Sequence, residues 1–246
     1  MLILIGVFFL TSIISVVTGS TSLITVPVMI ALGIEAHVAV ATNMLALTCM
    51  SVGGSVPFVR KGVVRRSQLP VLVVLTIVGS GLGAFLLVSV PLSSLRMIIG
   101  IAMCAVALFS ALNPSLGQTA ADVSATPLRR LAGYVVTFLL AIYGGFFSGG
   151  YVTLLTTAFV VFFGLTFLQS VAITKVINVF SSGIASAMFI YRGIVDLRLG
   201  LLLGLVMFVG ALLGGRIALS LSSAWLRRIF IAAVLCLAVK MLLPTH

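Results

Sequence analysis

Lys175 places a cationic side chain inside a long apolar stretch, the segment SVAITKVINVFSSG of residues 170–183. Asn178 follows at i+3, so a helix would present both side chains on one face. Ionisable groups within a membrane span are rare and usually functional. A buried ammonium beside hydroxyl, amide and glycine backbone donors suits an anion. The pattern therefore predicts an anion site, and the competing interpretation is a Lys175 side chain that snorkels to a membrane interface.

Carboxylates are almost absent from this chain. The three acidic residues, Glu35, Asp122 and Asp196, all stand in loops or at the edges of apolar runs. Cation and proton transport commonly use a carboxylate inside the membrane, so the sequence favours an anionic substrate. It also contains no zinc-protease, nucleotide-loop or serine-hydrolase motif and no paired carboxylates. We therefore expect no enzyme activity, no cofactor and no bound metal.

The composition places these residues in a lipid bilayer. The chain has 246 residues, of which 62% are hydrophobic and only 7% are charged. Soluble domains carry about 25% charged residues, and the long, non-alternating apolar runs favour helices over a barrel. The predicted fold class is therefore all-α, a polytopic helical membrane protein. The net charge of +11 is attributed to cytoplasmic loops, and nucleic acid is not an expected partner.

Two polar breaks interrupt the apolar pattern. One is Thr18–Ser22 and the other is Ser148–Gly150, and each precedes a short apolar run, at 23–33 and 152–165 respectively. Irregular backbone at membrane depth is tolerated only where protein covers it or it lines a cavity. Broken segments at matching positions indicate a transport site. The alternative is a plain loop outside the membrane, and whether the short runs re-enter or cross is left open.

The chain also repeats itself at an offset of about 131 residues. RKGVV at 60–64 matches YRGIV at 191–195, and GSGLGAFL at 79–86 matches GALLGGRI at 210–217. TGSTSLIT at 18–25 matches SGGYVTLL at 148–155, and AVATN at 39–43 matches VAITK at 171–175, which pairs Asn43 with Lys175. We expect a first repeat at 1–112, a polar cytoplasmic linker at 113–128, and a second repeat at 129–246.

The basic residues predict a topology by the preference of Lys and Arg for cytoplasmic loops. If the first helix of each half crosses and the short run returns, each half has four crossings and the two repeats are parallel. That arrangement, with eight crossings in an inner cell membrane and both termini in the cytoplasm, gathers most basic residues on the cytoplasmic side. These are Lys61, Arg65, Arg66, Arg129, Arg130, Arg192, Arg198 and Lys240.

The order of these motifs resembles the TauE/SafE family of membrane permeases, which is named for sulfite export. The resemblance rests on LITVPVMIALGIEAHVAVATN at 23–43, on FFSGGYVTLL at 146–155 and on ITKVINVFSSGIASAMFIYRGIVD at 173–196. It covers nearly the whole chain. The resemblance implies a transporter for a small sulfur-containing or organic anion, and the family name does not fix which anion.

We therefore expect a transporter of a small anion, such as a sulfur oxyanion or an organosulfonate of the sulfite or sulfoacetate kind. Export is the favoured direction of transport. The direction, any coupled ion and the oligomeric state stay open, and a homo-oligomer is compatible with the sequence. The alternative is a membrane scaffold or assembly protein without transport. The expected substrate-binding residues are Thr18, Gly19, Ser20, Thr42, Asn43, Ser148, Gly149, Gly150, Thr174, Lys175 and Asn178.

Overall fold

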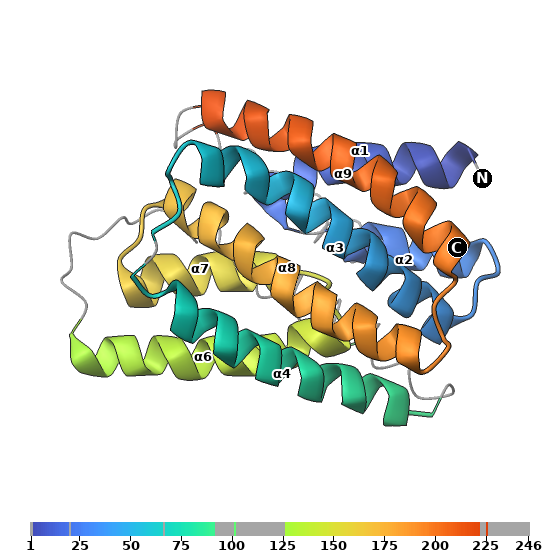
Figure 1. Ribbon diagram of the computed structural model, residues 1–246, viewed down its shortest axis with the longest axis horizontal. Helices are drawn as coiled ribbons and strands as arrows, with labels where there is room; N and C mark the ends of the chain where they lie inside the picture. The colour runs from blue at the N-terminus through green and yellow to red at the C-terminus, as the bar shows by residue number, and fades with distance from the viewer. Residues whose placement is uncertain are drawn as a thin grey trace.

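The computed structural model describes residues 2–19, 21–65, 67–91, 101, 126–221 and 225, and these residues form helices and turns without strands. The first half contains α1 (Leu2–Thr18), α2 (Ser22–Ala31), α3 (Ala36–Arg60) and α4 (Leu69–Ser89). The second half contains α6 (Pro127–Phe146), α7 (Tyr151–Phe163), α8 (Phe167–Tyr191) and α9 (Leu197–Ser220). The helices lie side by side along the longest axis of the molecule (Figure 1).

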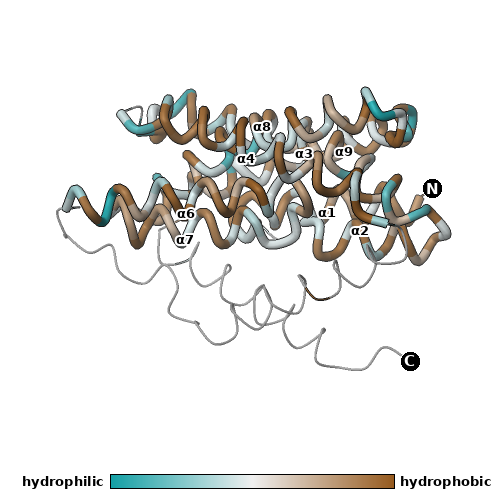
Figure 2. The backbone as a smooth tube through the Cα atoms, turned by 90° about the horizontal axis from the view of Figure 1, so that it is seen from below, coloured by the Kyte–Doolittle hydropathy of each residue, from teal (hydrophilic) through white to brown (hydrophobic). Residues whose placement is uncertain are grey.

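Four helices, α3, α4, α8 and α9, are long and apolar enough to cross a membrane. Their outward faces carry exposed hydrophobic side chains such as Val74, Phe85, Leu201 and Leu205. Hydrophobic residues fill most of the helix length, and hydrophilic segments gather near the two ends of the long axis (Figure 2). This distribution fits a bilayer, because lipid tails accept apolar side chains that water would exclude. The all-α, multi-pass prediction is confirmed in this respect.

The ends of these helices follow from local sequence. The Thr166 side chain accepts from the Gln169 backbone, the Gln169 side chain accepts from the Thr166 backbone, and this capping box starts α8. Asp196 caps α9 by accepting from the Leu199 backbone N–H. Such caps satisfy the first N–H groups of a helix, which have no partner within it.

Three helices, α1, α3 and α9, run in the same direction. As α9 is followed from start to end, it meets α3 and α1 in increasing residue order. The neighbours are Gly200 with Thr42, Gly204 with Cys49, Gly215 with Pro57, Gly210 with Ser12, and Gly214 with Val16. Since α1 and α3 are parallel, the intervening α2 must return along α1. The segment 2–31 is therefore a helical hairpin that begins and ends at the same end of the bundle (Figure 1).

The other long helices, α4, α6 and α8, run the opposite way. Gly79 of α4 lies against Ala141 of α6, and Gly83, one turn later, lies against Phe146. Helix α8 precedes α9 across the short turn at 192–196 and is antiparallel to it (Figure 1). Because α6 and α8 are parallel, α7 returns along α6. A second hairpin, 127–163, thus enters from the end opposite to the first.

These directions correct the predicted parallel repeats. The helices that the sequence repeat pairs are antiparallel in every case, α1 with α6, α3 with α8, and α4 with α9. The prediction failed because it let the first helix of each half carry the chain across, whereas each hairpin returns it to the end where it started. Apart from residues 101 and 126–128, the apolar runs at 95–112 and 226–243 and the linker at 113–128 lie outside the described residues, so the total number of crossings and the domain boundaries stay predictions.

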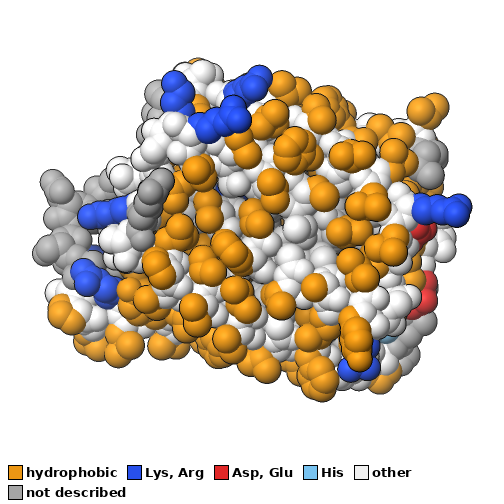
Figure 3. All heavy atoms as spheres, in the orientation of Figure 1, with side chains coloured by type: hydrophobic (Ala, Val, Ile, Leu, Met, Phe, Trp, Pro, Cys, Tyr) orange, Lys and Arg blue, Asp and Glu red, His pale blue; other side chains and the backbone are white. Residues whose placement is uncertain are grey.

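The grouping of basic residues changes accordingly. Lys61, Arg65, Arg129 and Arg130 lie at one end of the bundle, which we call the Lys61 end. Arg192 and Arg198 lie at the other, the Glu35 end, together with both described acidic residues, Glu35 and Asp196. Figure 3 shows the acidic side chains on the right and the larger group of basic side chains on the left. The predicted single basic side is therefore wrong, and Arg66 and Lys240 lie outside the described residues.

Close helix packing depends on the two small-residue patterns, Gly79 with Gly83 and Gly210 with Gly214. A side-chain carbon on Gly83 would overlap the Ile142 carbonyl oxygen of α6. A side-chain carbon on Gly214 would overlap the Ile13 carbonyl oxygen of α1. These glycines let the backbones approach closely, as small residues do between membrane helices, and so hold each hairpin against a long helix of the other half.

Candidate functional site

The tips of the two hairpins meet inside the bundle. The Ser22 and Ser148 hydroxyl oxygens, one from each hairpin, are 2.6 Å apart and hydrogen bonded. The Thr153 hydroxyl donates to the Thr18 carbonyl oxygen at 2.6 Å. All four residues are buried. The two polar breaks therefore satisfy each other's backbone and hydroxyl groups at a place that water or lipid does not reach.

Gly19 makes this approach feasible. Its φ is +72°, in the left-handed region that glycine adopts readily. A side-chain carbon at this position would overlap Val152 and the Thr153 backbone nitrogen at the start of α7. Glycine therefore serves twice here, by turning the chain after α1 and by admitting the tip of the second hairpin.

Asn43 links α3 to both hairpins through a chain of hydrogen bonds. Its Nδ2 donates to the Ser22 hydroxyl at 2.9 Å, and its Oδ1 accepts from the Thr25 hydroxyl at 2.7 Å. Ser22 in turn shares a hydrogen bond with Ser148, so the chain of hydrogen bonds reaches the second hairpin. Asn43 is 1% exposed. Its amide oxygen and its amide nitrogen both bond to the first hairpin, and Asn43 thereby fixes the tip of that hairpin.

Lys175 lies on α8 and is 2% exposed. Its Nζ donates to the Ser15 carbonyl oxygen at 2.8 Å, across to the first hairpin. Ser15 belongs to the last turn of α1, where the helix dipole is negative, and its carbonyl also accepts from the Gly19 backbone N–H at 2.9 Å. Among the described residues this carbonyl is the one hydrogen-bond partner found for the ammonium, which has three N–H donors. The helix end therefore offsets part of the charge and leaves donor capacity unused.

Asn178 lies one turn after Lys175, as its spacing predicted. Its Nδ2 donates to the Ser51 hydroxyl of α3 at 2.6 Å. Its Oδ1 is buried without a partner among the described residues. Ser51 could equally donate to the amide oxygen if the amide group turned over, because the two atoms are assigned from the hydrogen-bond network. Turned in that way, Asn178 would offer an N–H group to a ligand.

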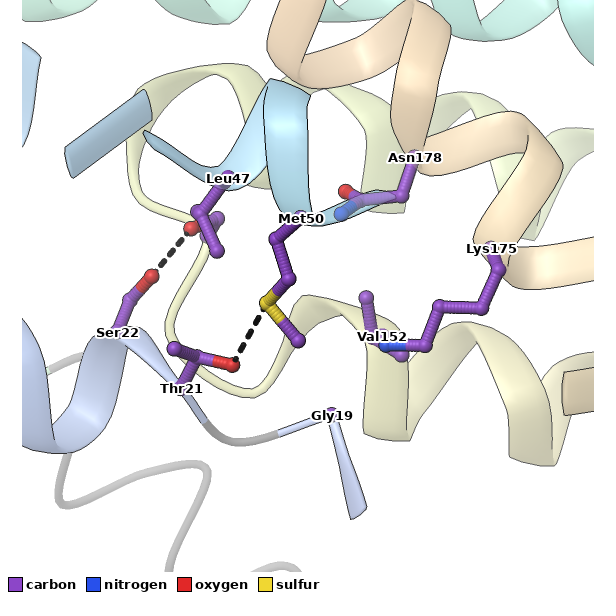
Figure 4. A pocket seen from close by; sticks show the side chains of 9 residues that line it. Gly19, Thr21, Ser22, Leu47, Met50, Val152, Lys175 and Asn178 are labelled. Atoms are coloured by element: carbon purple, nitrogen blue, oxygen red, sulfur yellow. Dashed lines mark hydrogen bonds between the residues drawn. The ribbon is translucent and has the colours of Figure 1, made fainter. Parts of the chain in front are cut away.

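A cavity of about 10 Å³ lies between the two tips, α3 and α8. That is about the space of a single water molecule. Figure 4 shows Lys175 and Asn178 extending from α8 on one side and Thr21 and Ser22 lying on the other. The cavity is lined by Gly19, Thr21, Ser22, Leu47, Met50, Ser148, Val152, Lys175 and Asn178.

Four predicted site residues line this cavity, namely Gly19, Ser148, Lys175 and Asn178. Four more lie directly behind it: Thr18 and Asn43 through the hydrogen bonds above, and Gly149 and Gly150 in the second break. The Gly149 carbonyl accepts from the Tyr143 hydroxyl at 2.5 Å, and Gly150 starts α7 with a φ of +76°.

Two predicted residues are directed elsewhere, and one lies outside the described residues. The Thr42 hydroxyl accepts from the Asp196 backbone N–H at 3.0 Å and so fastens the α8–α9 turn to α3. The Thr174 hydroxyl accepts from Thr156 of α7 at 3.3 Å. We expected the residue pairs 42–43 and 174–175 to face one cavity, but of these four residues Lys175 alone lines it. Ser20 is not among the described residues.

Sequence reasoning missed five lining residues, Thr21, Ser22, Leu47, Met50 and Val152. Thr21 and Ser22 belong to the predicted break at 18–22, so the sequence signal that selected Thr18, Gly19 and Ser20 could have selected them as well. Met50 accepts a 3.6 Å hydrogen bond from Thr21 through its sulfur. Leu47, Met50 and Val152 carry no signal that separates them from ordinary apolar residues of a membrane helix.

A larger cavity, of about 650 Å³, lies at the Lys61 end and reaches α8. It extends to Val176, the residue after Lys175, and the exposed basic residues Lys61 and Arg65 belong to the loop beside it. It is lined by Val59, Gly62, Val64, Leu69, Pro70 and Val176. No group of three His, Cys, Asp or Glu side chains within the described ranges could hold a metal ion.

Comparison with known proteins places this arrangement in a family. The model of the family described as sulfite exporter TauE/SafE matches residues 4–241, and the chain belongs to that family. The probable membrane transporter protein ORF9 of Sinorhizobium sp is 30% identical over 240 residues, which cover 97% of this chain and 91% of that protein. No solved structure matches the chain.

Two further relatives carry similar names. The probable membrane transporter protein YfcA of Escherichia coli K12 is 29% identical over 249 residues, covering 99% of this chain and 91% of that protein. A probable membrane transporter protein of Haemophilus influenzae is 27% identical over 240 residues, covering 97% and 93%. The chain is thus a multi-pass membrane protein of a transporter family.

Proposed function

We propose that this protein carries a small anion across the inner membrane, and that the anion binds Lys175 where the two hairpin tips meet. The observation that carries the proposal is the buried Lys175 ammonium with a single backbone carbonyl as its partner among the described residues. A buried charge without a full partner is costly. An anion would supply the missing charge and accept the remaining N–H donors.

The surrounding groups suit an oxyanion. Helices α2 and α7 both begin at the cavity, and helix N-termini present N–H groups and a favourable dipole to anions. The hydroxyls of Thr21, Ser22 and Ser148 line the same space. Together with the family name, these oxygen-directed donors support a sulfur-containing oxyanion or organosulfonate as the substrate.

The pairing of the helices supports two inverted repeats. The sequence repeat pairs α1 with α6, α2 with α7, α3 with α8 and α4 with α9. Under this pairing the contact of α3 with α9 corresponds to that of α8 with α4, and the contact of α1 with α9 corresponds to that of α6 with α4. All four contacts are present. Transporters built from inverted repeats bind substrate near the midplane at broken helices and move one repeat against the other. A cavity of about 10 Å³ is too small for an oxyanion, so we interpret this conformation as closed around the site.

We propose that the Lys61 end faces the cytoplasm, because it holds more basic and no acidic residues among those described. The start of α1 would then lie on the outer side, which replaces the earlier expectation of a cytoplasmic N-terminus. The 650 Å³ cavity would serve as the inner vestibule. An inside-negative potential drives a monoanion outward by about 2.3 kcal/mol per 100 mV, which favours export.

The test is anion-evoked current and tracer flux in proteoliposomes that contain the wild type or Lys175→Ala. We expect flux of a sulfur oxyanion or sulfonate that Lys175→Ala abolishes and that Lys61→Ala, an exposed lysine, leaves intact. Equal flux through the wild type and Lys175→Ala would show that Lys175 is not part of the binding site. A folded wild-type protein without any flux would favour the alternative of a membrane scaffold.

A further inference from the structure

We propose that the site selects anions that carry a single negative charge, and that it discriminates against dianions and zwitterions. The inference rests on the proposed function and narrows its substrate class. It follows from the charges and walls of the cavity between the hairpin tips.

The charge count is the first step. Among the described residues that are less than a tenth exposed, Lys175 is the one that bears a formal charge, and the remaining polar ones are Ser, Thr and Asn. No Asp or Glu lines the cavity. In a medium of low dielectric constant, stability requires that charges be compensated. One ammonium compensates one negative charge, so a dianion would leave the site with a net charge.

A zwitterion meets the opposite difficulty. Its anionic group can pair with Lys175, but its own ammonium would need an acceptor with negative charge. Within the described part of the chain, the acidic side chains lie at the Glu35 end, outside the buried site. The Ser15 carbonyl is already occupied by Lys175. A zwitterion would therefore bury one unpaired charge, which costs more than the hydrogen bonds can return.

The walls indicate an organic ion rather than a bare inorganic one. The lining of the cavity mixes polar side chains, Thr21, Ser22 and Ser148, with apolar ones, Leu47, Met50 and Val152. Binding sites for small molecules commonly combine apolar walls with a few placed polar groups. A small sulfonate with a short carbon chain matches this mixture, because its oxygens can accept from Lys175 and the hydroxyls while its methylenes contact the apolar side chains.

Three two-carbon sulfonates of similar size test the inference. Isethionate carries one negative charge, taurine is a zwitterion of the same skeleton, and sulfoacetate carries two negative charges. Binding to purified protein is measured by calorimetry, and tracer uptake into proteoliposomes is measured in parallel. We expect isethionate to bind at least about tenfold more tightly than taurine or sulfoacetate, because each of these two would leave one buried charge uncompensated.

Two variants link the preference to Lys175. Lys175→Gln should weaken isethionate about tenfold or more and bring the three affinities close together. Lys175→Arg keeps the charge and should keep their order, so a general folding defect is distinguished from loss of the charge. Lys61→Gln is the matched control, because that lysine is exposed in the α3–α4 loop.

The outcomes separate the two levels of the argument. Transport of isethionate and sulfoacetate with equal affinity would overturn the inference and leave the transporter standing. An unchanged order of affinities in Lys175→Gln would also overturn it, since the selecting charge would then lie elsewhere. Absence of binding and uptake for these sulfonates and for hydrogensulfite and sulfate alike, in a folded protein, would overturn the proposed function and the inference with it.

Discussion

The two halves of the molecule treat the same position differently. The sequence repeat pairs Asn43 of α3 with Lys175 of α8, and both side chains are buried beside a hairpin tip. Asn43 is bonded to its own hairpin, through Ser22 and Thr25. Lys175 instead reaches the hairpin of the other half, at the Ser15 carbonyl. One half therefore has an amide whose oxygen and nitrogen both bond to its own hairpin, whereas the other has an ammonium bonded to one backbone carbonyl among the described residues.

The cause lies in the residues of the two tips. By the same alignment, Ser22 and Thr25 correspond to Val152 and Leu155. Valine and leucine offer no acceptor, so the Lys175 side chain runs toward Val152 (Figure 4) without a partner there and takes a carbonyl elsewhere. Polar residues thus anchor the first tip, and apolar residues leave the charge of the second available. Under the proposed function, these few differences between the matching segments would separate a structural role for Asn43 from a binding role for Lys175.

The largest expected effect tests whether the halves are inverted. In a chain with Cys49, Cys104 and Cys236 replaced by serine, Lys61→Cys and Arg192→Cys each place one thiol at an exposed position. A thiol reagent that does not cross membranes should label Arg192→Cys in intact cells, and should label Lys61→Cys only after the cells are opened. Labelling of both from the same side would restore the parallel arrangement.

The next effect concerns the glycines that hold each hairpin against the other half. Gly83→Val would drive a side chain into the Ile142 carbonyl, and Gly214→Val would do the same at Ile13. Overpacking of this kind costs about 1–3 kcal/mol, so we expect both variants to unfold at lower temperature in detergent. Gly81→Val is the matched control, because a side-chain carbon there meets no atom within 4 Å. A control that unfolds as early as Gly83→Val would contradict the packing argument.

Asn43→Ala and Lys175→Met separate stability from transport. Asn43→Ala removes two buried hydrogen bonds, to Ser22 and from Thr25, and should lower the free energy of unfolding by about 1–3 kcal/mol. Lys175→Met removes an incompletely paired buried charge, so stability should be unchanged or increased, while anion flux should disappear. Thermal unfolding in detergent and flux in proteoliposomes measure the two effects. A Lys175→Met protein that is less stable than Asn43→Ala would reverse their assigned roles.

The smallest effect comes from making the second tip resemble the first. Val152→Ser introduces a hydroxyl near Lys175 that can accept one of its N–H groups and compete with the anion. A neutral hydrogen bond of this kind is worth about 1 kcal/mol, so the anion concentration for half-maximal current should rise by up to about tenfold. Val152→Ala, which removes volume without adding an acceptor, should change it less, and an equal rise in both would point to packing instead.

Much of the fold could be predicted because it depends on local sequence. Apolar runs specify helices in lipid, where each backbone group must be satisfied within its own segment. The breaks at 18–22 and 148–150 were visible as polar residues between apolar ones. The spacing of Lys175 and Asn178 placed both on one helix face, and both line the cavity. The sequence was least informative at Thr42 and Thr174, whose partners belong to other helices.

The sequence by itself determined that the chain is helical, that it belongs in a membrane, and that its buried charge is positive. It could not determine the direction of the helices, because a hairpin that returns and a helix that crosses have similar apolar lengths. It also could not indicate that Lys175 bonds to Ser15, which is 160 residues away along the chain. Only the tertiary structure decided these points, since they depend on which surfaces pack together rather than on the residues next to them in sequence.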